Sequence, residues 1–205
     1  MTKIRLAAAL AAATLIAASS ALAQPAKPVH LRGTIEKVDG NVLSIKTSSG
    51  AATTLKLADN PRITALTKAQ LSDIKEGSFI GVTAMPQPDG SQKAIGLHIF
   101  MDAQRGVVPA GFIPWDREPG STMTNADVAQ KVEGVDGQTL TVKYKDGEKK
   151  VTVPPNTPVV RFNPGNKDDL KPGAQFFIVA ATKQDDGSYT APAINVGRDG
   201  AVPPM

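Results

Sequence analysis

The sequence predicts an all-β protein with a small helical content, built as two five-stranded barrels in tandem. Three observations lead to this prediction. Apolar residues alternate with polar ones over short stretches, Asp-Gly and Ser-Gly pairs separate these stretches, and the whole pattern occurs twice. Alternation with a period of two is typical of a strand that buries one face. A length of 205 residues is enough for one or two domains.

The repeat is visible as direct sequence similarity. Val38–Lys46 matches Val135–Lys143, and Ala94–Ile99 matches Ala191–Val196. Residues 30–100 and 127–198 therefore represent two copies of one unit. The predicted organisation is a signal peptide at 1–23, a first barrel at 24–100, an ordered inter-repeat segment at 101–126, and a second barrel with a C-terminal tail at 127–205.

Each unit is predicted to contain three strands, a short helix and two more strands. In the first copy Leu31, Gly33 and Ile35 alternate with polar residues, and Asp39-Gly40 then predicts a hairpin turn. Thr67–Gln70 resembles a capping box that opens a short helix. In the second copy, Asn166 is the predicted cap of the corresponding helix.

This order in a unit of this size is typical of an OB-fold barrel. SH3-like barrels and a β-sandwich are the alternatives, because the closure of a sheet cannot be derived from one sequence. A unit this small buries a limited core, so the two copies are expected to pack against each other.

Residues 1–23 have the pattern of a signal peptide. Lys3 and Arg5 precede an apolar run, and Ala21-Leu22-Ala23 fits a cleavage site. We expect cleavage after Ala23 and a periplasmic location. The remaining 21 basic and 19 acidic residues leave a net charge of only +2. That charge gives little reason to expect a nucleic-acid partner, and no later stretch is apolar enough to span a membrane.

Composition also limits the chemistry. The chain has no Cys, and His30 and His98 are its only imidazoles. This excludes disulfides, thiolate nucleophiles and a three-His zinc site within one chain. No nucleophile elbow, zinc-protease helix or glycine-rich phosphate loop occurs. We therefore expect a protein that is not an enzyme, and a weak hydrolase is the third of our functional alternatives.

A possible metal site is the second alternative. His98, Met101 and Asp102 bring an imidazole, a thioether and a carboxylate close together in the sequence. Such ligands suit copper, or zinc, in an exported protein. The competing interpretation is structural: His98 ends a strand and faces solvent, while Met101 fills a gap in the core.

The inter-repeat segment carries the strongest candidates for binding. It contains Arg105, the only Trp of the chain at position 115, and Asp116. One interpretation is an ordered strap whose Trp115 fills the interface between the barrels, with Asp116 accepting a hydrogen bond from Arg105 or Arg117. The other is a ligand or partner site that uses Arg105, Trp115 and Asp116.

Four stretches carry a resemblance to a known family. They are HIFMDAQRG at 98–106, PWD at 114–116, PGSTMTNA at 119–126 and VGRDGAVPPM at 196–205. Together they resemble a family of exported bacterial proteins of unknown function with tandem OB-like repeats, often labelled "metal ABC transporter permease". The resemblance covers nearly all of the chain after residue 23. It implies a connection with metal transport and no catalytic residues, and Asp102 stands where the family is expected to have Glu.

These observations predict an exported, non-enzymatic binding or scaffold protein that acts through the segment after the first repeat. The expected partner is a periplasmic protein or a small ligand, and no cofactor is required. A periplasmic metal-binding accessory protein is the alternative, with copper or zinc as the metal. The sequence leaves the identity of the ligand and the oligomeric state open.

Overall fold

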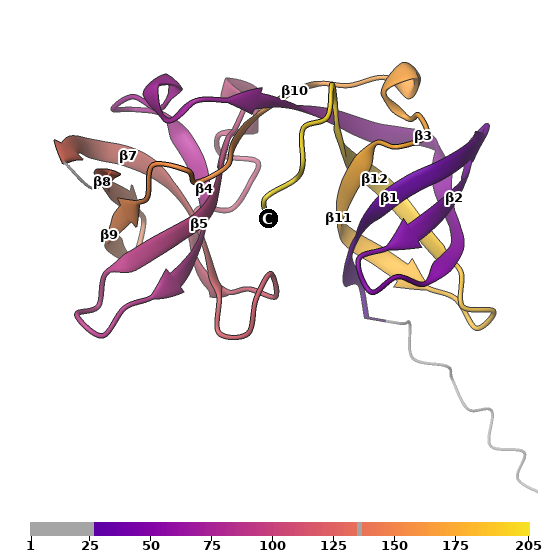
Figure 1. Ribbon diagram of the computed structural model, residues 1–205, viewed down its shortest axis with the longest axis horizontal. Coiled ribbons are helices and arrows are strands. Elements are labelled where there is room, and N and C mark those ends of the chain that lie inside the picture. The colour runs from indigo at the N-terminus through magenta and orange to yellow at the C-terminus, as the bar shows by residue number, and fades with distance from the viewer. Residues whose placement is uncertain (1–26, 135–136) are drawn as a thin grey trace, which may run out of the picture.

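The computed structural model describes residues 27–134 and 137–205, and within these ranges the protein is all-β (Figure 1). Three one-turn 3-10 helices, at Leu71–Asp73, Asp102–Gln104 and Lys167–Asp169, provide its helical content. The strands are β1 (Val29–Asp39), β2 (Val42–Thr47), β3 (Ala52–Ala69), β4 (Phe79–Pro86), β5 (Gln92–Ile99), β6 (Gly111–Pro114), β7 (Thr122–Gly134), β8 (Gly137–Tyr144), β9 (Gly147–Val153), β10 (Val159–Pro164), β11 (Gln175–Lys183) and β12 (Tyr189–Gly197).

Strands β1, β2, β3, β12 and β11 form a closed five-stranded barrel, which we call the first lobe. Antiparallel pairings join β1 to β2, β2 to β3, β11 to β12 and β1 to β11. A parallel pairing between β12 and β3, in which Ile194 lies opposite Ile63, closes the ring. Because the sheet closes on itself, the two strands that would be its edges pair with each other.

Strands β4, β5, β9, β8 and β7 form the second lobe in the same way. Antiparallel pairings run from β5 to β4, β4 to β7, β7 to β8 and β8 to β9. A short parallel contact, Gln92 opposite Val151 and Lys93 opposite Thr152, joins β5 to β9. Each lobe therefore takes three consecutive strands from one half of the chain and two from the other half, as the mixture of colours in each lobe of Figure 1 shows.

This exchange differs from the predicted organisation, in which 24–100 and 127–205 each formed a barrel of their own. The reason is the length of β3. Its 18 residues extend over about 60 Å, so the chain passes from the first lobe to the second before it turns back. The sequence predicted a helix that ended this strand early, at Thr67–Gln70, whereas Thr67 and Lys68 still belong to β3.

The helices between the third and fourth strands are shorter than predicted, since each is a single 3-10 turn. The first turn has its capping box at Gln70 and Asp73 rather than at Thr67. In the second repeat Asn166 caps the turn as predicted, because its side chain accepts a hydrogen bond from the Asp168 backbone N–H.

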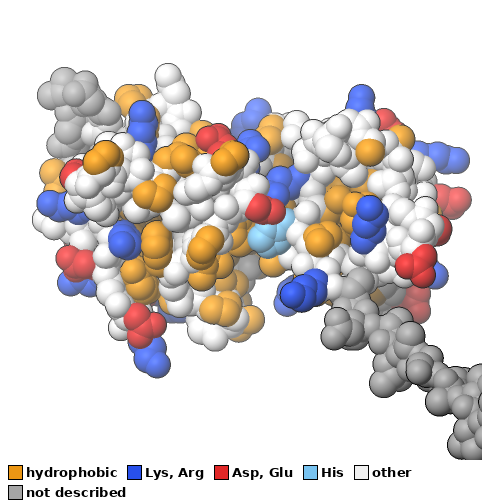
Figure 2. All heavy atoms as spheres, turned by 90° about the horizontal axis from the view of Figure 1, so that it is seen from below, with side chains coloured by type: hydrophobic (Ala, Val, Ile, Leu, Met, Phe, Trp, Pro, Cys, Tyr) orange, Lys and Arg blue, Asp and Glu red, His pale blue; other side chains and the backbone are white. Residues whose placement is uncertain are grey.

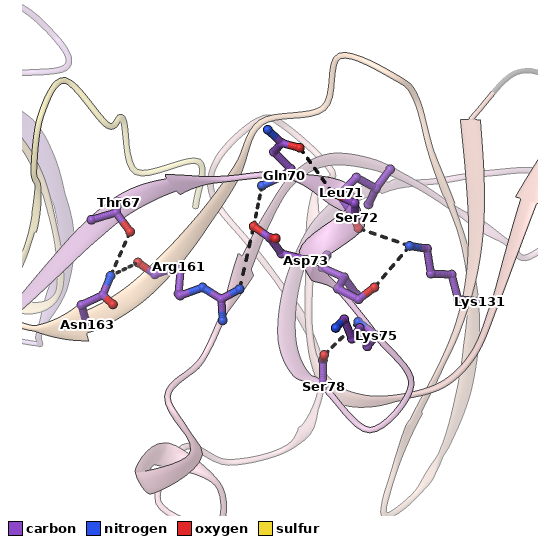
Figure 3. A network of polar contacts seen from close by, with 11 residues as sticks. Thr67, Gln70, Leu71, Ser72, Asp73, Lys75, Ser78, Lys131, Arg161 and Asn163 are labelled. Atoms are coloured by element: carbon purple, nitrogen blue, oxygen red, sulfur yellow. Dashed lines mark hydrogen bonds and ion pairs between the residues drawn. The ribbon is translucent and has the colours of Figure 1, made fainter.

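The long strand β3 and strand β10 bridge the two lobes. They pair antiparallel, with Leu66 opposite Phe162, and β10 also pairs in parallel with β5. Polar contacts reinforce this bridge (Figure 3). The Asn163 side-chain amide donates to Thr67 Oγ1 at 2.9 Å, and the Arg161 guanidinium lies 3.8 Å from the Asp73 carboxylate.

Three hydrophobic clusters match this architecture. One fills the first lobe and includes Leu43, Leu55 and Phe176, and the second fills the other lobe and includes Ile80 and Leu140. The third lies between the lobes and unites their sheets and the C-terminal tail; its buried members are Leu66, Phe79, Phe100, Met123, Val160, Phe162, Phe177 and Met205. The lobes therefore share one continuous buried interface.

Candidate functional site

The inter-repeat segment is ordered against the second lobe and faces the first. It contains a 3-10 turn, Asp102–Gln104, and the short strand β6, which pairs with the beginning of β7 so that Ile113 lies opposite Met123. Two hydrogen bonds close the turn that follows β6: the Trp115 backbone N–H donates to the Ser121 carbonyl at 2.8 Å, and Ser121 Oγ donates to the Trp115 carbonyl at 3.2 Å. These contacts direct Trp115 and Asp116 toward the junction of the lobes.

Trp115 lies half-buried in this junction. Its ring centroid is 4.3 Å from that of His30 and 6.1 Å from that of Phe177, two residues of the first lobe. The indole Nε1 is buried and has no hydrogen-bond partner among the described residues. Trp115 thus packs between the lobes, as the strap interpretation predicted, but its ring also reaches the surface.

Asp116 extends from the second lobe to two basic side chains of the first. Its Oδ1 lies 2.8 Å from His30 Nδ1 and 2.7 Å from Arg32 Nη2. Burial alone would raise the pKa of this carboxyl, but the hydrogen bonds and charges of Arg32 and His30 outweigh burial and lower the pKa to about 2. The prediction that Arg105 or Arg117 would donate to Asp116 is wrong, because its partners, His30 and Arg32, come from β1 at the beginning of the first repeat.

Arg32 connects three separate parts of the chain. Besides Asp116, its Nε donates to the main-chain oxygen of Met205 at 2.8 Å, and its guanidinium carbon lies 4.8 Å from the centre of the Phe177 ring. The C-terminal tail reaches this position because it crosses to the second lobe, where Pro204 packs against Gly96. A guanidinium is planar and has several N–H donors in fixed directions, so one Arg side chain can contact three partners at once.

A groove opens where these residues meet at the surface. It has a volume of about 460 Å³ and is lined by Pro28, Val29 and His30 of the first lobe and by Pro114, Trp115 and Asp116 of the segment. Figure 2 shows the imidazole at the junction of the two lobes, next to an acidic side chain. The walls are mostly apolar, while Asp116, with 53% of its side chain exposed, supplies a carboxylate at the rim.

Arg105, the third predicted binding residue, does not belong to this groove. Its guanidinium forms an ion pair with Asp127, donates to the Gly77 carbonyl at 2.8 Å and lies over the Phe79 ring. These partners all belong to the second lobe or the loop before it. Arg105 therefore holds the beginning of the segment in place.

The three predicted metal ligands lie in different environments. His98 is buried, with its ring stacked 5.1 Å from that of Phe162 and edge-on to Phe100. Burial lowers the pKa of His98 to about 3, and its Nδ1 has no partner among the described residues. Met101 is half-buried and packs against the cluster between the lobes, whereas Asp102 is exposed. A metal would reach His98 only if this aromatic packing opened.

The remaining metal-binding side chains do not supply an alternative cluster. Across residues 27–134 and 137–205, no three His, Asp or Glu side chains come together in a way that could hold a metal ion. The expectation that His98 faces solvent is wrong, because β5 turns this side chain inward onto Gly81.

His30 and Arg32 are the site residues that sequence reasoning missed. Alternation along the first strand placed Arg32 on its polar face, but nothing in the sequence indicated a partner 84 residues away. His30 lies close to the beginning of the described chain, yet it belongs to the ordered strand β1. A His and an Arg separated by one residue on a strand were the only available signal.

Comparison with known proteins finds no matching family model, no similar curated protein and no similar solved structure. Within the described residues, none of the helices is long and apolar enough to cross a membrane. The fold and the site together define an all-β protein with a closed five-stranded barrel and a groove at the junction of its lobes.

Proposed function

We propose that this protein is a non-enzymatic binding protein that holds an apolar segment of a partner protein in the groove between its lobes. The observation that carries the proposal is the position of Trp115, whose ring lines an open groove instead of lying fully within the core. Tryptophan is enriched among residues that dominate binding energy at protein interfaces.

The surroundings of the groove support a polypeptide partner. Val29 and Ile113 belong to the two strand segments that border it, and 41% and 48% of their surfaces are exposed. Apolar surface at the edge of an apolar groove favours a partner that buries it. The Asp116 carboxylate at the rim offers an acceptor for a donor of the partner.

The groove is also preformed. Arg32, His30 and Asp116 fix the segment against the first lobe, so the groove needs no folding step before a partner binds. A preorganised site loses less conformational entropy on binding than a flexible one. This rigidity favours a binding role. The groove lining also offers no Ser, Thr or Lys side chain next to the His30–Asp116 pair that could act as a nucleophile.

The proposal includes an export route and a fold type. Signal-peptide cleavage after Ala23 would place the protein in the periplasm; residues 1–26 lie outside the described ranges. The intact mass of exported protein, lacking residues 1–23, tests this part.

We further assign both lobes to the OB type. The rings β1-β2-β3-β12-β11 and β7-β8-β9-β5-β4 each have three consecutive antiparallel strands, and the third of these strands pairs in parallel with the last strand of the other two.

Site-specific photo-crosslinking tests the binding function. A crosslinker at position 113 should capture one discrete protein in cells, whereas the same group at Val107, which is 69% exposed in the same segment, should not. The purified partner should then bind Ile113→Ser and Val29→Ser at least tenfold more weakly than wild type. Val107→Ser is the matched control and should bind normally; equal weakening by all three variants would contradict the proposal.

A further inference from the structure

A second cavity lies at the open end of the first lobe. Its volume is about 520 Å³, and its lining comes from the beginning of β1, the turn between β2 and β3, and the turn between β11 and β12. The two turns are tied together, because Thr53 Oγ1 donates to the Gly187 carbonyl at 3.0 Å. The cavity is therefore built from both repeats, and it meets the groove described above at His30.

The lining is rich in hydroxyl groups and contains charges of both signs. Ser48, Ser49 and Tyr189 supply hydroxyls, Lys183 an ammonium group and Asp186 a carboxylate. The Asp186 Oδ1 accepts the Ser188 backbone N–H at 2.9 Å, which orients the carboxylate at the tip of the turn. Lys183 forms no ion pair with any described residue.

We propose that this cavity binds a neutral polyhydroxylated ligand, a saccharide of one or two units. Sugar hydroxyls donate and accept hydrogen bonds, so they suit a lining that offers hydroxyls, an ammonium group and a carboxylate together. A multivalent anion would meet the Asp186 carboxylate, and a multivalent cation would meet Lys183 and Arg32. The volume falls within the range typical of small-ligand sites.

The half-buried Tyr189 adds an apolar surface to these polar groups. Its ring packs against the core of the first lobe, which fixes its orientation at the cavity wall. A sugar ring has one or two faces of C–H groups, and an aromatic side chain with a polar tip can contact such a face and also form a hydrogen bond. Tyr189, Lys183 and Asp186 together give this cavity an aromatic face, a hydrogen-bond donor and a hydrogen-bond acceptor, the three features that a saccharide site uses.

The repeat supplies matched controls for a test. The turn Asp186-Gly187-Ser188 has a counterpart in Asp89-Gly90-Ser91 of the second lobe, where Asp89 Oδ1 accepts the Ser91 backbone N–H in the same way. Asp89 does not line the cavity. Asp186→Asn and Asp89→Asn therefore make the same chemical change in the same turn, and only the first alters the proposed site.

Binding of maltose and of chitobiose to the full-length exported protein should be measured by calorimetry and by saturation-transfer NMR. At least one disaccharide should bind saturably, and Asp186→Asn and Lys183→Gln should each weaken binding at least tenfold. Asp89→Asn and Lys93→Gln should bind like wild type. The absence of saturable binding by both sugars, or equal effects of the Asp186 and Asp89 variants, would overturn the proposal.

The same titrations separate this site from the groove. Ile113→Ser should leave saccharide binding unchanged, because Ile113 does not line the cavity. Saturable binding of inorganic phosphate, lost in Lys183→Gln, would also overturn the proposal by assigning the cavity to anions. The inference does not depend on the proposed protein partner, since its variants lie outside the groove.

Discussion

Arg32 and Asp116 lie 84 residues apart in the sequence, yet Arg32 Nη2 is 2.7 Å from Asp116 Oδ1. Arg32 belongs to the first lobe, and Asp116 belongs to the segment that is paired with the second. The same guanidinium holds the main chain of Met205. One side chain therefore joins both lobes and the C-terminal tail at the edge of the proposed groove.

Asp116→Asn should weaken this connection modestly. About half of the Asp116 side chain is exposed, so solvent screens the pair and we expect a loss of about 1 kcal/mol or less in the free energy of unfolding at pH 7. The pKa of Asp116 is lowered in the folded state, so its contribution is present above the ordinary value near 3.8 and is lost as pH falls toward about 2.

Denaturant titrations at pH 7 and at pH 2.5 test this expectation. The stability difference between wild type and Asp116→Asn should be smaller at pH 2.5 than at pH 7. A difference that stays constant across this range would show that the charge of Asp116 does not contribute.

His98 should make the protein less stable as pH falls through the weakly acidic range. Its pKa is lowered from 6.5 to about 3 by burial, so the unfolded chain binds a proton below pH 6.5 that the folded chain does not. Stability should therefore fall by up to about 1.4 kcal/mol per pH unit between pH 6.5 and 4.5 because of this residue.

The slope can be assigned with two variants. His98→Gln should be less stable than wild type at pH 7.5 but should show a flatter dependence of unfolding free energy on pH. Val107→Ser, which changes an exposed side chain without a titratable group, should keep the wild-type slope. If the wild-type and His98→Gln curves run parallel, burial of the neutral imidazole is not the cause.

Gly81→Ala should be strongly destabilising. A Cβ at this position would lie 1.9 Å from His98 Nε2, and the imidazole has little freedom because it stacks on Phe162. We expect a loss of about 3 kcal/mol, as in other overpacked cores. Gly111→Ala, where the added Cβ meets nothing within 4 Å, should change stability by about 0.5 kcal/mol or less.

A double variant checks the assigned contact. In Gly81→Ala/His98→Ala the ring that causes the clash is absent, so the loss of stability should be smaller than the sum of the two single losses. Additive losses would place the strain of Gly81→Ala elsewhere.

The two halves of the chain should not fold separately. Residues 24–126 contain β1, β2 and β3 but lack β11 and β12, which complete the first lobe. This fragment should show no cooperative thermal unfolding, whereas mixing it with residues 127–205 should restore a cooperative transition. A cooperative transition of the isolated fragment would contradict the observed strand exchange.

Trp115→Ala should affect both folding and partner binding. The ring contacts His30 and Phe177 but is only half-buried, so we expect a loss of about 2–3 kcal/mol, at the lower end for large aromatic truncations. The fluorescence maximum of the single Trp in wild type should lie between those of a core and a solvated indole. A fully solvated emission spectrum would contradict the observed packing.

Much of the fold follows from local patterns. Alternation placed Leu31 and Ile35 on the buried face of the first strand, the Asp39-Gly40 pair marked a hairpin, and Asn166 marked the cap of a turn. These features depend on residues close in sequence, where turn chemistry and strand periodicity act directly.

Assembly of the site required information that is not local. The sequence identified Trp115 and Asp116 as candidates, but His30, Arg32 and Met205 reach them only because β3 continues past Thr67 and carries the chain into the other lobe. The sequence by itself determined the all-β class and the buried faces of strands such as β1 and β2. Only the tertiary structure decided which strands complete each barrel, because strand pairing depends on residues far apart in the sequence and the length of β3 carries the chain from one lobe to the other.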